Sequence, residues 1–308
     1  MSCDILCLGE PLVEFNQVDG PEWRQGFGGD VSNVAVAAAR QGARAGIATR
    51  LGDDGFGRAL MEMWAAEGVD TSAVSYDAHA PTGLYFVRHG PEGHAFEYRR
   101  SGSAASGMTA ETLPRGAIAA SGTLHLSGIT QAISASTRVA SVAAMEAARV
   151  AGARISYDPN LRLALWPLEE ARPVIFDALS RADVALPGLE DARSLTGLTD
   201  PHEILAEIQA RGPKIVALTL GKDGVLIGVE GRVTEVASLA VDAVDATGAG
   251  DCFDGAFLAR LAAGDDPVEA GRYAVAAAAL STTDYGAVAP IPYADAVTAA
   301  LTASGAEA

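Results

Sequence analysis

Short apolar runs alternate along this chain with longer stretches whose apolar residues recur every three or four positions. The short runs have the length of buried strands and lie at residues 5–9, 45–49, 123–126, 154–157, 184–186 and 215–219. The longer stretches have helical spacing and lie at residues 31–41, 56–67, 134–150, 168–179 and 201–210. Because strands that alternate with helices usually pair in parallel, this order predicts an α/β fold with a mostly parallel sheet covered on both faces.

Two stretches interrupt the alternation. Residues 82–100 hold two strand-like runs around a turn at 90–93, and residues 224–238 hold two more around 230–231. We expect the first hairpin to belong to a small β lid, formed by roughly residues 10–28 and 82–105, and the second to extend an edge of the sheet. The alternative for each is a peripheral extension without a functional role. Without repeats or a long linker, residues 1–308 are expected to form a single α/β domain.

Composition excludes several classes of partner. The chain has 39 acidic and 22 basic residues, so it should repel nucleic acid and anionic membrane surfaces. Its three cysteines lack Cys-x-x-Cys spacing, and its N-terminus has no basic leader, which together predict a cytoplasmic protein. No apolar stretch approaches the roughly 20 residues of a membrane span. The histidines lack His-Glu-x-x-His spacing, which argues against a zinc hydrolase.

The most informative motif is Asp-Ala-Thr-Gly-Ala-Gly-Asp at residues 245–251. A strand-like run at 241–244 precedes it, and a helix begins within it. Glycines at a helix start allow a ligand to approach the unpaired N–H groups, which attract phosphate; a turn without any ligand is the alternative. Asp251 could complement the helix dipole or accept a proton from an attacking hydroxyl. The combination favours phosphoryl transfer. The chain lacks both a P-loop and a complete dinucleotide-binding fingerprint.

Residues 28–33, Gly-Gly-Asp-Val-Ser-Asn, and residues 245–251 resemble two motifs of the ribokinase-like (pfkB-type) sugar kinases. The resemblance extends over nearly the whole chain. It implies a three-layer α/β/α sandwich with a β lid, ATP as phosphoryl donor and Mg²⁺ as cofactor. It also implies that Asp251 is the catalytic base and that the amides from Gly248 to Asp251, with Ala249 and Gly250 between them, form an anion hole. Dependence on a monovalent cation such as K⁺ is left open.

The same resemblance assigns nucleotide and metal contacts. Residues Thr219, Gly221 and Gly224 resemble the family's Thr-x-Gly-x-x-Gly nucleotide loop, although such a sequence could also be a simple turn. Thr247 would supply a hydroxyl to the phosphate or cation site. Family members often carry Asn-x-x-Glu near a metal-bound water. Here only the glutamate, Glu190, is present, and it could instead be an ordinary helix-start residue.

Two stretches bear on the substrate. Strand geometry places Tyr98 and Arg100 on one face, and arginines there could either bind a sugar-acid carboxylate or be a solvated pair. Residues 96–106 and 157–166 resemble 2-keto-3-deoxygluconate kinases. That resemblance, together with the two family motifs, implies substrate contacts from Gly29, Asn33, Tyr85, Tyr98, Arg100, Arg162, Asp251 and Asp284.

The resulting hypothesis is an ATP-dependent kinase that converts 2-keto-3-deoxygluconate, a small-molecule sugar acid, to its 6-phosphate. A fructokinase or another neutral-sugar kinase of the same family is the alternative, and a catalytically silent sugar- or nucleotide-binding regulator is a weaker one. Because lid strands with open edges often pair between subunits, a homo-oligomer through the β lid is expected.

Overall fold

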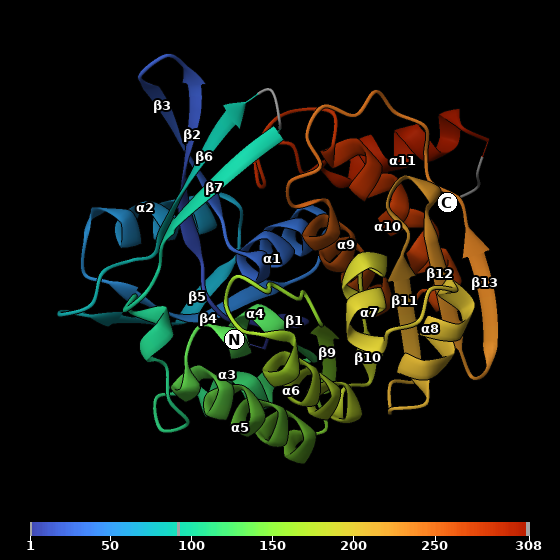
Figure 1. Cartoon of the computed structure of the whole chain (residues 1–308), viewed down its shortest axis with the longest axis horizontal. Coiled ribbons are helices and arrows are strands. Elements are labelled where there is room, and N and C mark those ends of the chain that lie inside the picture. Colours follow the sequence, from blue (N-terminus) through green and yellow to red (C-terminus); the bar gives the residue numbers. More distant parts are fainter. Residues whose placement is uncertain (1, 91–92, 306–308) are drawn as a thin grey trace.

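The computed structural model describes residues 2–90 and 93–305. Within them, a nine-stranded sheet has the order β13-β12-β11-β10-β9-β8-β1-β4-β5 (Figure 1). All neighbouring strands from β11 to β5 pair in parallel, and β12 and β13 add an antiparallel hairpin at one edge. The strands are β1 (Ile5–Leu8), β4 (Ala45–Gly52), β5 (Asp70–Asp77), β8 (Thr123–Ser127), β9 (Arg154–Asp158), β10 (Val184–Ala185), β11 (Ile215–Thr219), β12 (Val225–Val229) and β13 (Arg232–Val236).

Helices cover both faces of this sheet, and strand β1 shows why. Its residues Ile5 and Cys7 enter one apolar core, whereas Leu6 and Leu8 enter the other, because successive side chains of a strand point to opposite faces. One layer of helices comprises α1 (Asp30–Arg40), α2 (Gly55–Ala66), α9 (Ala249–Ala263), α10 (Pro267–Ser281) and α11 (Ala294–Ala303). The other comprises α3 (Arg115–Ala120), α5 (Ala135–Ala151), α6 (Leu168–Arg181), α7 (Leu189–Thr196) and α8 (Pro201–Gln209).

A second, four-stranded sheet forms the lid, in the order β3-β2-β6-β7. Figure 1 shows these strands extending beyond one side of the central sheet. Phe15 of the lid stacks on Phe86 of the lid at 5.4 Å between ring centroids and meets Phe56 of α2 edge-on at 5.8 Å. The lid is therefore anchored by aromatic packing at its base. Its strands are β2 (Leu12–Asp19), β3 (Glu22–Gly28), β6 (Leu84–Gly90) and β7 (Gly93–Arg99).

The expected fold class, an α/β/α sandwich with a mostly parallel sheet and a β lid, is confirmed, as is the edge position of the second hairpin. The strand expected at 241–244 is wrong. Val244 and Asp245 donate their N–H groups to the carbonyl of Thr282, at 2.7 and 3.1 Å, instead of joining a sheet. Residues 91 and 92 of the expected first turn lie outside the described residues. None of the described helices is long and apolar enough to cross a membrane.

Close packing of α1 against α9 brings two distant helix starts together. At their crossing, a Cβ on Gly255 would lie 2.5 Å from Cβ of Ala37 and 2.5 Å from the carbonyl oxygen of Val34, so only glycine permits this approach. The first turns of both helices consequently face the same region, beside the lid (Figure 1).

Candidate active site

The first turn of α9 presents free backbone donors. Gly248 precedes the helix with φ of 76°, in the left-handed region, and a Cβ there would lie 2.9 Å from the carbonyl oxygen of Ala287. The N–H of Ala249 donates to the carbonyl of Ala246 at 3.2 Å. Within the described chain, no hydrogen bond occupies the N–H groups of Gly250 and Asp251. Two donors at the positive end of a helix dipole can bind an anion.

Beside these donors, Asp251 has the properties of a general base. Its Oδ2 accepts a hydrogen bond from Nδ2 of Asn33 on α1, at 2.7 Å. Burial and the nearby charge of Asp30 raise the pKa of Asp251 to about 7, against the opposing effects of Asn33 and Arg162. A carboxylate that titrates near neutral pH can take a proton from a hydroxyl and release it again.

A cavity of about 340 Å³ opens on the α9 side of this turn. Three residues expected at a nucleotide, Thr219, Gly221 and Gly224, lie on its wall together with Gly250. Most of the remaining wall is apolar. It is formed by the segment that follows β13 and by helices α9 and α10, with the side chains of Leu239, Val241, Ala243, Phe253, Val275, Ala278 and Ala279. Its size, apolar lining and proximity to the α9 donors suit a nucleotide base and sugar.

Thr247 is not among the residues that line this cavity. Its hydroxyl donates to Oδ1 of Asp245 at 2.7 Å, and Oδ2 of the same carboxylate accepts the N–H of Gly286 at 3.0 Å. In this structure Thr247 therefore fastens the loop before α9 to the segment around Gly286.

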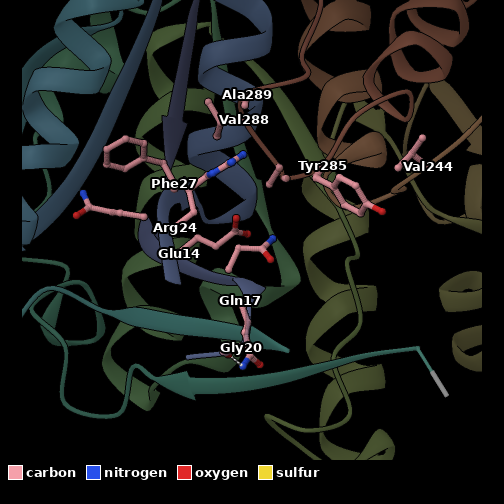
Figure 2. Close-up of a pocket in the computed structure, with 14 residues that line it drawn as sticks. Glu14, Gln17, Gly20, Arg24, Phe27, Val244, Tyr285, Val288 and Ala289 are labelled. Atoms are coloured by element: carbon pink, nitrogen blue, oxygen red, sulfur yellow. Dashed lines mark hydrogen bonds between the residues drawn. The ribbon is translucent and has the colours of Figure 1, made fainter. Parts of the chain in front are cut away.

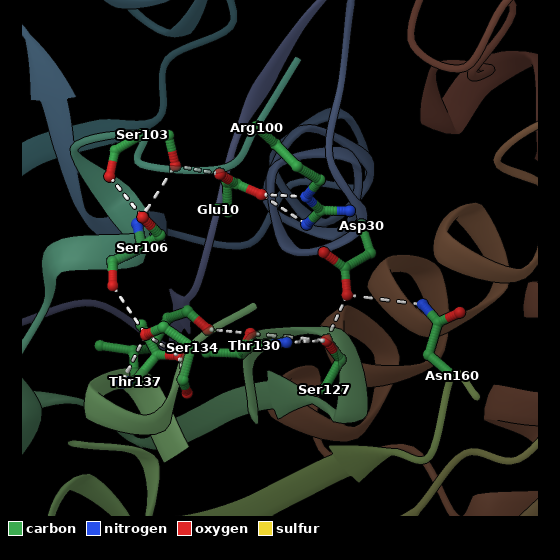
Figure 3. A network of polar contacts seen from close by, with 11 residues as sticks. Glu10, Asp30, Arg100, Ser103, Ser106, Ser127, Thr130, Ser134, Thr137 and Asn160 are labelled. Carbon is green, nitrogen blue, oxygen red and sulfur yellow. Dashed lines mark hydrogen bonds and ion pairs between the residues drawn. The ribbon is translucent and has the colours of Figure 1, made fainter. Parts of the chain in front are cut away.

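On the lid side, Arg100 is held by a carboxylate that the sequence did not reveal. Its Nε donates to Oε2 of Glu10 at 2.6 Å, and its Nη2 forms an ion pair with the same oxygen. Glu10 is 1% exposed and also accepts the hydroxyl of Ser103. Figure 3 shows the guanidinium lying between Glu10 and Asp30. Burial raises the pKa of Glu10, and Arg100 opposes that rise.

Two tyrosines of the lid sheet lie next to Arg100. Tyr85 and Tyr98 face each other across β6 and β7 and stack at 5.7 Å, and the Arg100 guanidinium lies 5.6 Å from the Tyr98 ring centroid, on the same face as expected. The hydroxyl of Tyr85 donates to Glu14. Glu14 in turn borders an open hollow of about 800 Å³ between β2, β3 and residues 285–289 (Figure 2).

The segment after β9 supplies the second arginine. Nη1 of Arg162 lies 3.5 Å from Oδ2 of Asp191, which also accepts the N–H of Leu161 at 2.9 Å. The Arg162 side chain is 51% exposed, and its positive charge opposes the pKa rise of both Asp251 and Asp30. Arg162 and Arg100 thus both lower the pKa of Asp30, from separate elements.

Two expected site residues have exposed side chains in the described structure. Asp284 is exposed, and its Oδ1 accepts the N–H of Tyr285. The Glu190 side chain is 81% exposed and pairs with Arg193 at 2.6 Å. The described residues contain no group of three or more His, Cys, Asp or Glu side chains arranged to hold a metal. Glu190 could therefore help to bind Mg²⁺ only if water molecules and phosphate oxygens supply most of the ligands of the ion.

Several buried carboxylates around Asp251 were not among the expected site residues, although Asp158 lies in the 157–166 stretch that resembles the sugar-acid kinases. Burial, followed by neighbouring negative charges, raises the pKa values of Asp158 and Asp254 well above the usual range. Two features of the sequence could have indicated the buried carboxylates. Asp30 lies inside the Gly-Gly-Asp-Val-Ser-Asn motif, and Glu10 directly follows the first strand-like run.

Comparison with known proteins agrees with this geometry. The chain matches the family model described as "pfkB family carbohydrate kinase" over residues 4–294. It is 37% identical to the 2-dehydro-3-deoxygluconokinase of Thermoproteus tenax, over 90% of this chain and 87% of that one. It is 34% identical to fructokinase-1 of Zea mays, over 94% of both chains.

A solved fructokinase with bound ATP from Xylella fastidiosa superimposes with a TM-score of 0.90, at 26% identity and 98% coverage of both chains. The relatives therefore include kinases for a sugar acid and for a neutral sugar at similar identity. Family match, fold and the arrangement around Asp251 lead to one conclusion: this chain belongs to the pfkB family of carbohydrate kinases.

Proposed function

We propose that the chain transfers the γ-phosphoryl group of ATP to the primary hydroxyl of 2-keto-3-deoxygluconate, giving the 6-phosphate. The observation that carries this proposal is that the charges of Arg100 and Arg162 both lower the pKa of Asp30, whose own charge acts on Asp251. A neutral sugar gains little from two guanidinium groups, whereas a carboxylate can accept paired hydrogen bonds from them. Glu10 would hold Arg100 in place for that contact.

In the proposed reaction, Asp251 accepts the proton of the sugar hydroxyl while that oxygen bonds to the γ-phosphorus. The bond from phosphorus to the bridging oxygen breaks, and ADP leaves with its electron pair. The N–H groups of Gly250 and Asp251 donate hydrogen bonds to the charged oxygens of the phosphoryl group while it is transferred. Asp251 then releases its proton to solvent. Bound Mg²⁺ would neutralise phosphate charge, and Glu190 would hold it through water.

Substitution of Arg162 by leucine tests the substrate. If Arg162 binds the carboxylate, kcat/KM for the keto acid should fall about 10- to 150-fold, the equivalent of one charged hydrogen bond, with little change for fructose. The control is Arg172→Leu, at an exposed arginine whose Nη2 donates to the Ser194 carbonyl at 3.2 Å. Equal losses on both substrates would argue against carboxylate recognition.

Fructokinase activity is the second candidate, because both arginines already have carboxylate partners, Glu10 and Asp191. An ADP-release assay of the unmodified enzyme with gluconate-derived and galactonate-derived keto acids and with fructose separates these activities. Preference for fructose would replace the sugar-acid proposal. Absence of ADP release with every sugar would favour a regulatory protein.

We also propose that two copies of the chain pair through their lids. Strand β7 is an edge of the lid sheet, and its Phe96 and Tyr98 side chains are 45% and 44% exposed. An open strand edge with exposed aromatic side chains favours association. Light scattering should give twice the chain mass, and Phe96→Glu should lower it; a monomeric unmodified protein would refute the pairing.

A further inference from the structure

Two buried oxygen atoms near Asp251 have no hydrogen-bond partner among the described residues. They are Oδ1 of Asp30 and Oδ1 of Asn33, on side chains of residues that are 8% and 3% exposed. The two residues are three positions apart at the start of α1, so their side chains lie on the same face of the helix. A buried acceptor left unpaired costs about 1–3 kcal/mol, so a donor supplied by a ligand would stabilise both.

The orientation of Asp30 is fixed by the opposite oxygen. Its Oδ2 accepts the hydroxyl of Ser127 and, at 3.4 Å, Nδ2 of Asn160 (Figure 3). Asn160 is held with φ of 32°, which is uncommon for a residue other than glycine and often marks a functional site. Since both donors lie at Oδ2, Oδ1 is left without a hydrogen bond, although the charge of Arg100 lies nearby and lowers the pKa of Asp30.

The position of Asn33 indicates which of the two unpaired oxygens lies nearer to Asp251. Its Nδ2 contacts the catalytic base Asp251 at 2.7 Å, so its own Oδ1 lies next to the place where the primary hydroxyl is activated. Asp30 is the first residue of α1, three positions before Asn33. A substrate with hydroxyls on successive carbons after the reacting one would meet Asn33 first and Asp30 second.

We propose that Asp30 determines specificity for the sugar's hydroxyl pattern: its Oδ1 accepts a hydrogen bond from the hydroxyl on C4, beside the substrate contact of Asn33 that the family resemblance already implies. This inference rests on the proposed phosphorylation at O6. It makes Asp30 the residue that distinguishes gluconate-derived from galactonate-derived keto acids, which differ in configuration at C4.

A purely structural role for Asp30, as a first-turn acid that complements the helix dipole, would not require burial. Glu203 occupies the first turn of α8 and is exposed. It therefore provides a matched control for the dipole effect without contact to the site.

The first test is Asp30→Asn. Ser127 and Asn160 both donate to the Oδ2 position, so the new amide should turn its oxygen toward them and place its NH₂ group where Oδ1 was. We expect kcat/KM for the preferred keto acid to fall about 10- to 150-fold and the preference between the two C4 epimers to shrink to a few-fold. Glu203→Gln should leave both quantities unchanged. An unchanged epimer preference in Asp30→Asn would overturn the proposal.

The second test removes the hydroxyl instead of the carboxylate. The unmodified enzyme should lose about 10- to 150-fold in kcat/KM on the 4-deoxy analogue, and Asp30→Asn should lose little more on that analogue, because the same hydrogen bond is already absent. Independent, additive losses would contradict a direct contact.

Failure of the proposed function is distinguishable from failure of this inference. If the unmodified enzyme prefers fructose, the sugar-acid proposal falls, and the role of Asp30 is then tested with fructose and its C4 epimer tagatose. Loss of that epimer preference in Asp30→Asn would still support a C4 contact, and its retention would refute it.

Discussion

The two sides of Asp251 differ in the physical means that they offer for binding a ligand. The nucleotide side is a hollow of about 340 Å³ whose walls are mostly alanine, valine and glycine, with Lys222 as its one charged lining residue among those described. The lid side carries the ion pair of Glu10 with Arg100, and Figure 3 shows Asp30 on the other side of the guanidinium. In the proposed function, shape and backbone donors would bind ATP, whereas fixed side-chain charges would bind the sugar. Single substitutions should alter substrate choice only on the lid side.

The largest expected effect comes from the residue between the two sides. Asp251→Asn removes the base but leaves both free N–H groups of α9, so kcat should fall by about 10²- to 10⁴-fold while ATP still binds. Turnover measures the first quantity, and the ATP-induced rise in melting temperature measures the second. Undiminished turnover would remove Asp251 from the mechanism.

The next largest effect is expected on the free energy of unfolding, when the buried ion pair on the lid side is broken. Glu10→Gln leaves Arg100, whose side chain is 11% exposed, without its carboxylate, and breaking a buried pair costs about 3–5 kcal/mol. The control is Glu97→Gln, which breaks the exposed pair with Arg99 and should cost at most about 1 kcal/mol. Denaturant unfolding of both variants gives the comparison. Equal costs would mean that burial of the Glu10 pair does not matter.

The crowded carboxylates also predict how stability depends on pH. Asp251 has a pKa of about 7 when folded and roughly 3.9 when unfolded, so between these values the folded state binds the extra proton. Stability should therefore fall as pH rises, by ~2 kcal/mol between pH 5.5 and 7.5 from Asp251 alone. Burial raises the pKa of Asp30, Asp158 and Asp254 in the same direction. Unfolding without ligand at the two pH values tests this; a rise in stability with pH would refute it.

The smallest effect should come from the nucleotide side. Ala279 lines the hollow and is 8% exposed, so Ala279→Leu would occupy part of the nucleotide space and raise KM for ATP about tenfold. KM for the sugar should stay the same, because no sugar-side charge changes. The control is Ala299→Leu on the exposed face of α11. A raised sugar KM would show that the two sides are not independent.

Local patterns predicted much of this molecule. Strand and helix periodicity located β1, β4, β8, β9 and β11, and the glycines before Asp251 located the start of α9. Edge strand β5 was missed because its residues are mostly half-buried and polar, which leaves no continuous apolar run. The 241–244 run resembled a strand, but its N–H groups found the Thr282 carbonyl instead.

The contacts that give the site its chemistry arose only from tertiary structure. Glu10 and Arg100 are separated by 90 positions, and Asp30 and Asn160 by 130, so no local spacing could pair them. Glu190 and Asp191 are neighbours in sequence, yet a rotation of about 100° per helical residue leaves the first in solvent and turns the second toward Arg162. Residue types and short-range order follow from the chain alone, because backbone geometry is local. Which carboxylate meets which arginine depends on the packing of distant elements.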